Sequence, residues 1–364
     1  MSTREGTTAS NLTRLLYVLG PLLMLLFVLV LFASLLGLQD VREQMTLKEL
    51  KGWSGFVQSV GDMQVSNEEH YKGIKAFLSG ANFKIVLTQT VIVAIGALGM
   101  TMIIVSGGID LSVGSIVALT SVVGATSLVH GHSALTAVLL TLLIGGVIGL
   151  ANGGVIAGLR MMPFIVTLGM MGMARGAAKW LADNQTVNSP ESPINAIMDT
   201  SIDPVHLLPL PPGVWLAIGL AVMMSVVMRQ TVFGRYIFAI GSNEATARLC
   251  GIRVPMHKVL IYALAGLFFG LAGLMQLSRL TQGDPTVAIG LELDIIAAVV
   301  IGGASLSGGT GSIAGSMIGA LIMAVLRNGS NQMGWRNYVQ EIIIGIVIII
   351  AVGLDKLRQS RANT

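Results

Sequence analysis

Long runs of apolar residues, separated by short polar stretches, repeat along almost the whole chain. The runs cover residues 15–38, 85–105, 112–129, 134–157, 163–180, 214–228, 259–277, 295–304, 313–326 and 339–354. An α-helix needs about 20 apolar residues to cross the hydrocarbon core of a bilayer. The pattern therefore predicts an all-α polytopic membrane helix bundle with about ten transmembrane helices. The run at 295–304 is too short to cross by itself, which indicates a half-helix.

Composition supports this fold class. Hydrophobic residues make up 53% of the 364 residues and charged residues 11%, and the mean hydropathy is +0.79. Soluble domains contain about 25% charged residues, and so few charges cannot cover a water-facing surface. We expect a single transmembrane domain over residues 1–364 and no large soluble catalytic domain.

The charges between the runs predict the orientation. Residues 229–258 hold five Lys or Arg and one acidic residue, and the tail after 354 adds three basic residues. By the positive-inside rule both segments are cytoplasmic. Residues 183–213 hold four acidic residues, no Lys or Arg and six of the ten prolines, which predicts an irregular outer (periplasmic) loop. Segment 39–84 is too polar to span and predicts an extracytoplasmic loop. Ten crossings then leave both termini cytoplasmic.

Glycines recur at four-residue intervals within several runs. The stripes are Gly145, Gly149 and Gly153; Gly154 and Gly158; Gly172 and Gly176; Gly266 and Gly270; and Gly311, Gly315 and Gly319. Small residues at this spacing let helix backbones approach closely in a bilayer. We expect tight helix packing along these stripes, which carry no information about a substrate.

One glycine-rich motif, GG-x-x-LS-x-G, occurs twice, at 107–114 and at 302–309. Glycine permits a tight reversal, and Asp110 or Ser112 can cap the amides of the next helix. Two interpretations stay open: a capped hairpin, or a discontinuous helix beside a translocation route, as in many transporters. Because the copies lie six runs apart, they should point the same way. The candidate break or pathway residues are Gly107, Gly108, Asp110, Ser112, Gly302, Gly303, Ser305 and Ser307.

Few polar residues fall inside the runs. Arg175 and Lys179 lie near the predicted outer end of their run and can snorkel, and Asp294 is expected to cap a helix that starts after it. Asn152 and Gln89 are interior polar candidates, for interhelical hydrogen bonds or for the pathway. No chain of Asp, Glu and His indicates a proton relay, which weighs against ion-coupled transport.

Motifs for enzyme chemistry are missing from the sequence. The single cysteine and the five histidines have no metal-binding spacing, and the chain contains neither GxxxxGK[ST] nor GxSxG. We therefore expect a non-catalytic chain with no metal and no cofactor. Any ATP that drives it must bind another subunit.

The basic segment 229–258 contains the signals of a short helix. Ser242 or Asn243 suits the N-cap, Glu244 the first turn and Gly251 the C′ position, and Pro255 stops the helix from continuing.

One face of this short helix is predicted to be an apolar ridge of Ala245, Leu249 and Ile252, with Arg248 beside it. Such a ridge can enter a groove on another protein, or the helix can lie on anionic headgroups.

Three motifs resemble those of one transporter family: GGIDLSVGS at 107–115, GRYIFAIGSNEATARLCGI at 234–252 and ELDIIAAVVIGGASLSGGTGSIAG at 292–315. They are similar to motifs of inner-membrane permease subunits of bacterial ABC importers for ribose, xylose, arabinose and galactose. The resemblance covers about 85–354. The long 39–84 segment departs from the family, and the EAA-x3-G signature of another importer class is not met.

The resemblance implies a multi-pass inner-membrane permease that pairs with a second copy or a paralogue. It implies ATP-binding cassette ATPase subunits and a periplasmic sugar-binding protein as partners, with membrane lipid around the chain and no nucleic acid. By resemblance, the coupling helix that docks on the ATPase contains Asn243, Glu244, Ala245, Arg248, Leu249 and Gly251.

The predicted function is translocation of a monosaccharide into the cytoplasm, driven by ATP hydrolysed on a separate subunit. An ion-coupled secondary transporter of a small polar solute is the alternative, and uptake that stops with an uncoupler but survives ATP depletion would indicate it. A scaffold or membrane enzyme would need a convergent catalytic set, which the sequence lacks. Aromatic residues make up only 5% of the chain, so we expect weak sugar binding by the permease and selectivity in the binding protein.

Overall fold

The computed structural model describes residues 20–37, 39, 72–200 and 210–362. The start of the first predicted run, most of the predicted 39–84 loop and part of the predicted 183–213 loop lie outside the described residues. Within them the fold is all-α, as predicted. The only strands assigned there are the two-residue β1 (Val187–Asn188) and β2 (Gln282–Gly283), which pair antiparallel.

The helices follow most of the predicted runs. Their bounds are Gly20–Gly37, α3 (Lys72–Phe77), α4 (Gly80–Val105), α5 (Val113–Val129), α6 (Ala134–Gly158), α7 (Pro163–Leu181), the 3₁₀ turn η1 (Asn195–Ile197), α8 (Pro212–Gln230), α9 (Val232–Ser242), α10 (Glu244–Leu249), α11 (Val254–Leu280), α12 (Leu291–Ile301), α13 (Ile313–Gln332) and α14 (Asn337–Ala362). Six of them are long and apolar enough to span a membrane: Gly20–Gly37, α4, α6, α8, α11 and α13. The helix α4 begins at Gly80, inside the segment predicted as a loop.

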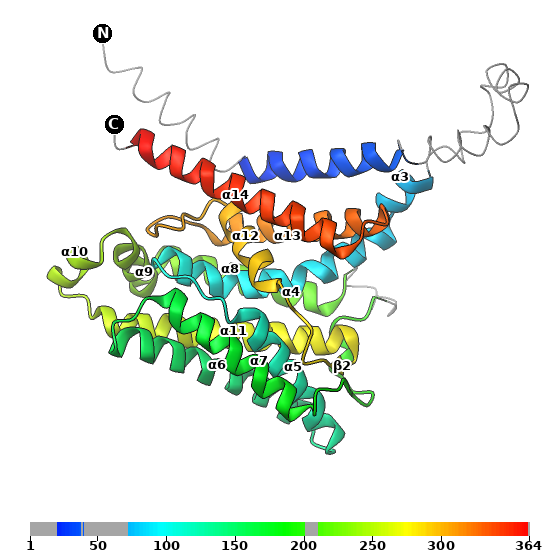
Figure 1. The fold of residues 1–364 in the computed structure, drawn as a ribbon, viewed down its shortest axis with the longest axis horizontal. Helices are drawn as coiled ribbons and strands as arrows, with labels where there is room; N and C mark the ends of the chain where they lie inside the picture. The colour runs from blue at the N-terminus through cyan, green and yellow to red at the C-terminus, as the bar shows by residue number, and fades with distance from the viewer. Residues whose placement is uncertain (1–19, 38, 40–71, 201–209, 363–364) are drawn as a thin grey trace, which may run out of the picture.

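Helix α4 forms the centre of the bundle. Its apolar residues from Val91 to Val105 are buried on every side, and it packs against α8, α11, α12 and α13. Figure 1 shows α5, α6, α7 and α11 on one side of α4 and α13 and α14 on the other. The helices α9 and α10 lie at one end of the bundle, here called the α10 end, and β2 lies at the opposite strand end (Figure 1). The positive-inside prediction makes the α10 end cytoplasmic.

The glycine stripe of α6 confirms the expected close packing. A methyl group added at Gly145 or Gly149 would strike the backbone of α11 at Gly266, and Gly153 faces Val259 of the same helix. Lipid gives no hydrophobic drive between helices, so this backbone contact supplies packing and weak polar attraction instead.

Other stripes do not pack within the chain. Methyl groups added at Gly154, Gly158, Gly172 or Gly176 would meet no atom within 4 Å, so the expectation of tight packing is wrong for these four glycines inside the described chain. Gly311 lies before α13 begins, in the turn, whereas Gly315 and Gly319 pack on α12.

The basic segment 229–258 is more helical than predicted. An additional helix, α9, precedes the predicted short helix, and only Thr231 separates it from α8. The Thr231 hydroxyl caps α9 by accepting a hydrogen bond from Gly234 N at 3.2 Å. Pro255 lies in the first turn of α11, directly after Val254, where its missing N–H costs nothing, so it is part of the next helix.

Candidate functional site

The two copies of the glycine motif meet in space at the α10 end. The Gly309 N–H donates a hydrogen bond of 2.9 Å to the carbonyl oxygen of Val105, the last residue of α4. Gly107, Gly303 and Gly308 have φ of +83°, +94° and +87°, a region that side chains disfavour. The glycines therefore supply reversals that bring both breaks together, pointing the same way as expected.

The end of α9 fits between these two breaks. A methyl group at Gly241 would overlap the Val105 carbonyl oxygen and lie 2.7 Å from Gly309 N, and one at Gly309 would lie 3.0 Å from Ser242 Cα. Gly107, Gly241 and Gly309 thus pack backbone to backbone in one contact, here called the glycine junction. One residue, Asn243, separates Ser242 from the first residue of α10.

Helix α10 forms where the sequence predicts it. The Asn243 side-chain oxygen accepts a hydrogen bond from Thr246 N at 2.9 Å, and Gly251 has φ +84° beyond the helix end. Asn243 is therefore the N-cap, whereas Ser242 is the last residue of α9.

The exposed face of α10 differs from the predicted ridge. Leu249 is 89% exposed and Ala245 is exposed, but Ile252 packs with buried Ala247 against Ile240 and Val254. The prediction that Ile252 joins the ridge is wrong, because the reversal at Gly251 turns it towards α9 and α11.

Two ion pairs fix Glu244 at the start of α10. Its carboxylate accepts hydrogen bonds from Arg248 on the same helix and from Lys258 Nζ on α11 at 2.7 Å. Partial burial would raise the pKa of Glu244, but the hydrogen bonds and charges of Lys258 and Arg248 outweigh it and lower the pKa. Glu244 therefore stays ionised at neutral pH and ties α10 to α11.

The first glycine motif also holds a buried polar cluster. The Asp110 carboxylate accepts hydrogen bonds from the amide of Ser112 at 2.7 Å and from its hydroxyl, and Asn152 of α6 donates to Ser112 Oγ at 3.1 Å. Asn152 also donates to Asp110 Oδ2 at 3.4 Å. This confirms interhelical hydrogen bonding by Asn152. The Ser112 side chain makes no capping hydrogen bond to α5, since its hydroxyl donates to Asp110 and accepts from Asn152, and Asp110 accepts only from the N-cap residue itself.

The second motif repeats the same turn. Ser305 and Ser307 occupy the positions of Asp110 and Ser112; their hydroxyls lie 2.8 Å apart, and Ser307 N donates to Ser305 Oγ at 3.3 Å. Beside this turn, a methyl group on Gly302 would strike Gly315, so α12 and α13 meet closely there. Gly108 instead lies against the Tyr262 hydroxyl of α11.

Helix α12 is the short helix that the sequence indicates. It has 11 residues, which span about 16 Å at 1.5 Å per residue. It starts at Leu291, so the expectation that Asp294 caps a helix from 295 is wrong. Asp294 is buried in the first turn and accepts a 2.6 Å ion-pair hydrogen bond from Arg327 of α13.

Arg175 holds the segment that precedes α12. Its guanidinium donates to the carbonyl oxygens of Pro285 at 2.9 Å and Val287 at 2.6 Å. The snorkelling prediction is wrong for Arg175, because an irregular segment leaves carbonyls without helix partners and the partly buried cation satisfies them. Lys179, one turn further on, is exposed.

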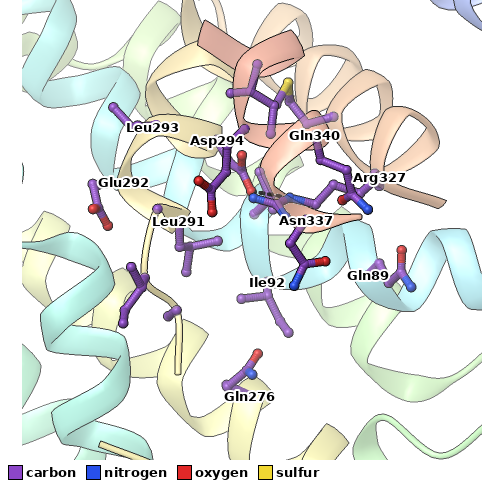
Figure 2. A pocket seen from close by; sticks show the side chains of 18 of the residues that line it. Gln89, Ile92, Gln276, Leu291, Glu292, Leu293, Asp294, Arg327, Asn337 and Gln340 are labelled. Carbon is purple, nitrogen blue, oxygen red and sulfur yellow. Dashed lines mark hydrogen bonds and ion pairs between the residues drawn. The ribbon is translucent and has the colours of Figure 1, made fainter. Parts of the chain in front are cut away.

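A polar cavity of about 610 Å³ lies between α4, α11, α12, α13 and α14. Figure 2 shows Asp294 paired with Arg327 in it, with Gln89, Gln276 and Asn337 around the same space. Gln89 was expected in the interior, and it lines this cavity. Sequence analysis missed Gln276, Arg279 and Arg327; an arginine directly after the apolar run 313–326 was the available signal for a buried acidic partner.

Comparisons with known proteins give one consistent result. The family model described as "Branched-chain amino acid transport system / permease component" matches residues 82–352. The ribose import permease of Escherichia coli K12 is 42% identical over 275 residues, which are 75% of this chain and 85% of that protein. The Bacillus subtilis 168 ribose import permease is 41% identical (78% and 88%), and the L-arabinose ABC transporter permease of Azospirillum brasilense is 34% identical (78% and 83%). No solved structure matches the chain.

Proposed function

The chain belongs to this family of transport-system permease components, and on that premise we propose that it imports a monosaccharide, driven by ATP hydrolysed on a separate subunit. It is a multi-pass protein of the inner membrane, with six long apolar helices among its described residues. The names of its relatives refer to ribose, L-arabinose and fructose, which favours a sugar over the amino acids named in the family description. No residue of the chain acts as a catalyst in this proposal.

The glycine junction is the observation that carries the proposal. Helix α10 projects the exposed Leu249, and the residues just before α10 pack on both glycine breaks. An ATPase that grips α10 can therefore move the ends of α4 and α12 through backbone contacts. A ligand or partner shifts a conformational equilibrium only through differential contacts with the two states, and this junction offers them.

The other partners follow from the same assignment. A binding protein would deliver the sugar at the strand end, where β1, β2 and η1 lie, and a second permease copy or a paralogue would complete the transporter. The break and pathway residues Gly107, Gly108, Asp110, Ser112, Asn152, Gly302, Gly303, Ser305 and Ser307 are proposed to shape the moving region. Asp110, Ser112 and Asn152 would hold its geometry through hydrogen bonds.

Reconstitution tests the proposal. The permease would be placed in liposomes with its ATPase and binding protein, and uptake of D-ribose, L-arabinose and D-fructose measured with ATP on the ATPase side. We expect uptake that needs ATP and all three components and that a protonophore does not reduce. Uptake by the permease alone, driven by an ion gradient and insensitive to ATP, would establish the secondary-transporter alternative.

A further inference from the structure

We infer that the polar cavity beside α12 is an internal binding site for the sugar within a single permease chain. This inference rests on the proposed function and specifies where in the chain the sugar binds and which side chains it contacts. The site would hold the sugar between its delivery at the strand end and its release at the α10 end.

The segment before α12 brings the site deep into the bundle. Gly283 packs against Val122 of α5, whereas the carbonyl oxygen of Ala288 lies against Gly114, eight residues earlier on α5. Eight helical residues correspond to about 12 Å, so the segment descends by about that distance along α5. The irregular backbone then turns at Gly290, with φ +81°, and α12 begins. Irregular backbone at such depth is tolerated where it is covered by protein or lines a cavity.

The size and lining of the cavity suit a neutral polyhydroxyl ligand. Its volume of about 610 Å³ lies within the usual range of small-molecule sites, about 300–1,000 Å³. Amide side chains of Gln89, Gln276 and Asn337 offer both donors and acceptors. Among the described residues, no aromatic side chain lines the cavity, so a sugar would not be stacked and would bind weakly, as a transit site requires.

Asp294 supplies an unsatisfied acceptor in the lining of the cavity. Its side chain is 3% exposed; Oδ2 accepts from Arg327 Nε, and Oδ1 has no hydrogen-bond partner among the described residues. A buried acceptor without a donor is costly. A sugar hydroxyl would donate to Oδ1, while the remaining guanidinium N–H groups of Arg327 would donate to a neighbouring hydroxyl.

The charged lining of the cavity does not select the ligand class. Besides the Asp294–Arg327 pair, the lining holds Arg279, Glu292 and Glu341, which could pair with the charged groups of an amino acid. The choice of a sugar therefore rests on the names of the relatives, and the experiment below compares the two ligand classes directly.

Protection from labelling tests the site directly. The chain has one cysteine, the exposed Cys250, so Cys250→Ser gives a background without thiols. Asn337→Cys would place a thiol in the cavity, and Tyr338→Cys, 57% exposed and outside the cavity lining, is the matched control. Maleimide labelling would be followed with D-ribose, L-arabinose, D-fructose or L-leucine, and with betaine as an osmotic control.

We expect at least one of the three sugars to slow labelling of Asn337→Cys and to leave Tyr338→Cys unchanged. If no sugar protects Asn337→Cys, if both positions are protected alike, or if L-leucine alone protects, the inference is wrong.

A transport measurement separates this site from the proposed function. The double variant Asp294→Leu/Arg327→Met removes both charges together, and replacing both members of a buried ion pair by apolar residues usually keeps a protein folded. We expect unchanged thermal stability and a loss of sugar uptake of about tenfold or more, the equivalent of losing one or two good hydrogen bonds. Normal uptake by the double variant would overturn the internal site alone, whereas failure of the wild-type assembly to take up sugar with ATP would overturn the proposed function.

Discussion

The backbone amide of Gly309 and the backbone carbonyl of Val105 are joined by a 2.9 Å hydrogen bond. This bond links the end of α4 to the turn after α12, 204 residues later in the sequence, and Gly241 packs against both of its atoms. Backbone contacts transmit displacement more directly than contacts between long side chains, which can absorb it by changing rotamer. The position of α10 is therefore coupled to both glycine breaks.

Gly241→Ala should disrupt this junction. The new methyl group would overlap the Val105 carbonyl oxygen, and relieving such overpacking costs about 1–3 kcal/mol. We expect the ends of α4 and α9 to separate, sugar uptake to fall strongly and ATP hydrolysis to lose its dependence on the loaded binding protein. Uptake and ATPase activity of the reconstituted transporter would be measured together.

Gly219→Ala is the matched control for this substitution. A methyl group at Gly219 in α8 meets no atom of the described chain within 4 Å, so uptake should stay normal. If Gly241→Ala transports like Gly219→Ala, the junction does not couple α10 to the breaks.

Charge reversal tests the ion pairs that Glu244 makes at the start of α10. Glu244→Lys would repel both Arg248 and Lys258, and Lys258→Glu would repel Glu244; partly exposed pairs of this kind contribute about 0–1 kcal/mol. We expect both single variants to fold and to reduce coupled uptake, and Glu244→Lys/Lys258→Glu to recover part of it. No recovery, at equal expression, would mean that orientation of α10 does not depend on this pair.

The ion pairs of Glu244 predict that their contribution to thermal stability does not change with pH near neutrality. The folded-state pKa of Glu244 is lowered from an unfolded value of about 4.3. Its stabilising contribution is therefore complete above the unfolded value and is lost as pH falls through the lower folded value. Between about pH 6 and pH 8, thermal stability should therefore change equally with pH in the wild type and in Glu244→Gln. A difference that grows within this range would contradict the assignment.

Leu249 is expected to make the apolar contact with the ATPase. It is 89% exposed, so Leu249→Asp should leave the melting temperature of the permease unchanged and prevent co-purification with the ATPase. Leu159→Asp is the control, because Leu159, at the end of α6, is 70% exposed and lies outside α10. Equal loss of the ATPase in both variants would point to a general effect of charge at exposed sites.

Local signals in the sequence predicted much of the fold and part of the site. Apolar runs located most of the helices, and Asn243 and Gly251 marked the ends of α10, because capping depends on a few adjacent residues. Asn152 was identified as interior because a lone amide in an apolar run needs a partner.

Long-range partners could not be predicted in this way. Arg175 binds carbonyls about 110 residues away, and Asp294 pairs with an arginine on another helix. Periodicity and spacing describe one segment at a time, whereas these contacts depend on how the irregular segment before α12 descends beside α5. The close packing of Gly241 against Val105 could not be predicted either, because only the folded chain brings the two residues together.

Arg175→Gln should loosen the descending segment before α12. The shorter neutral side chain cannot reach both carbonyl oxygens as the guanidinium does, so we expect lower uptake and faster hydrogen exchange across residues 282–290. Lys179→Gln, on the same helix and exposed, should affect neither. Unaltered exchange in Arg175→Gln would show that other contacts hold the segment.

Two glycines of α6, five residues apart, should respond to alanine with opposite signs. A methyl group at Gly149 would strike the Tyr262 carbonyl oxygen and lie 3.0 Å from Gly266 Cα, so Gly149→Ala should destabilise the fold by about 1–3 kcal/mol. Gly154 is exposed with no atom near its added methyl, and a Gly→Ala change inside a helix stabilises by about 1 kcal/mol. Thermal unfolding in detergent would compare the two variants. Because the two glycines lie on the same helix, a loss of stability in both variants would mean that Gly154 also packs closely, against a segment outside the described residues.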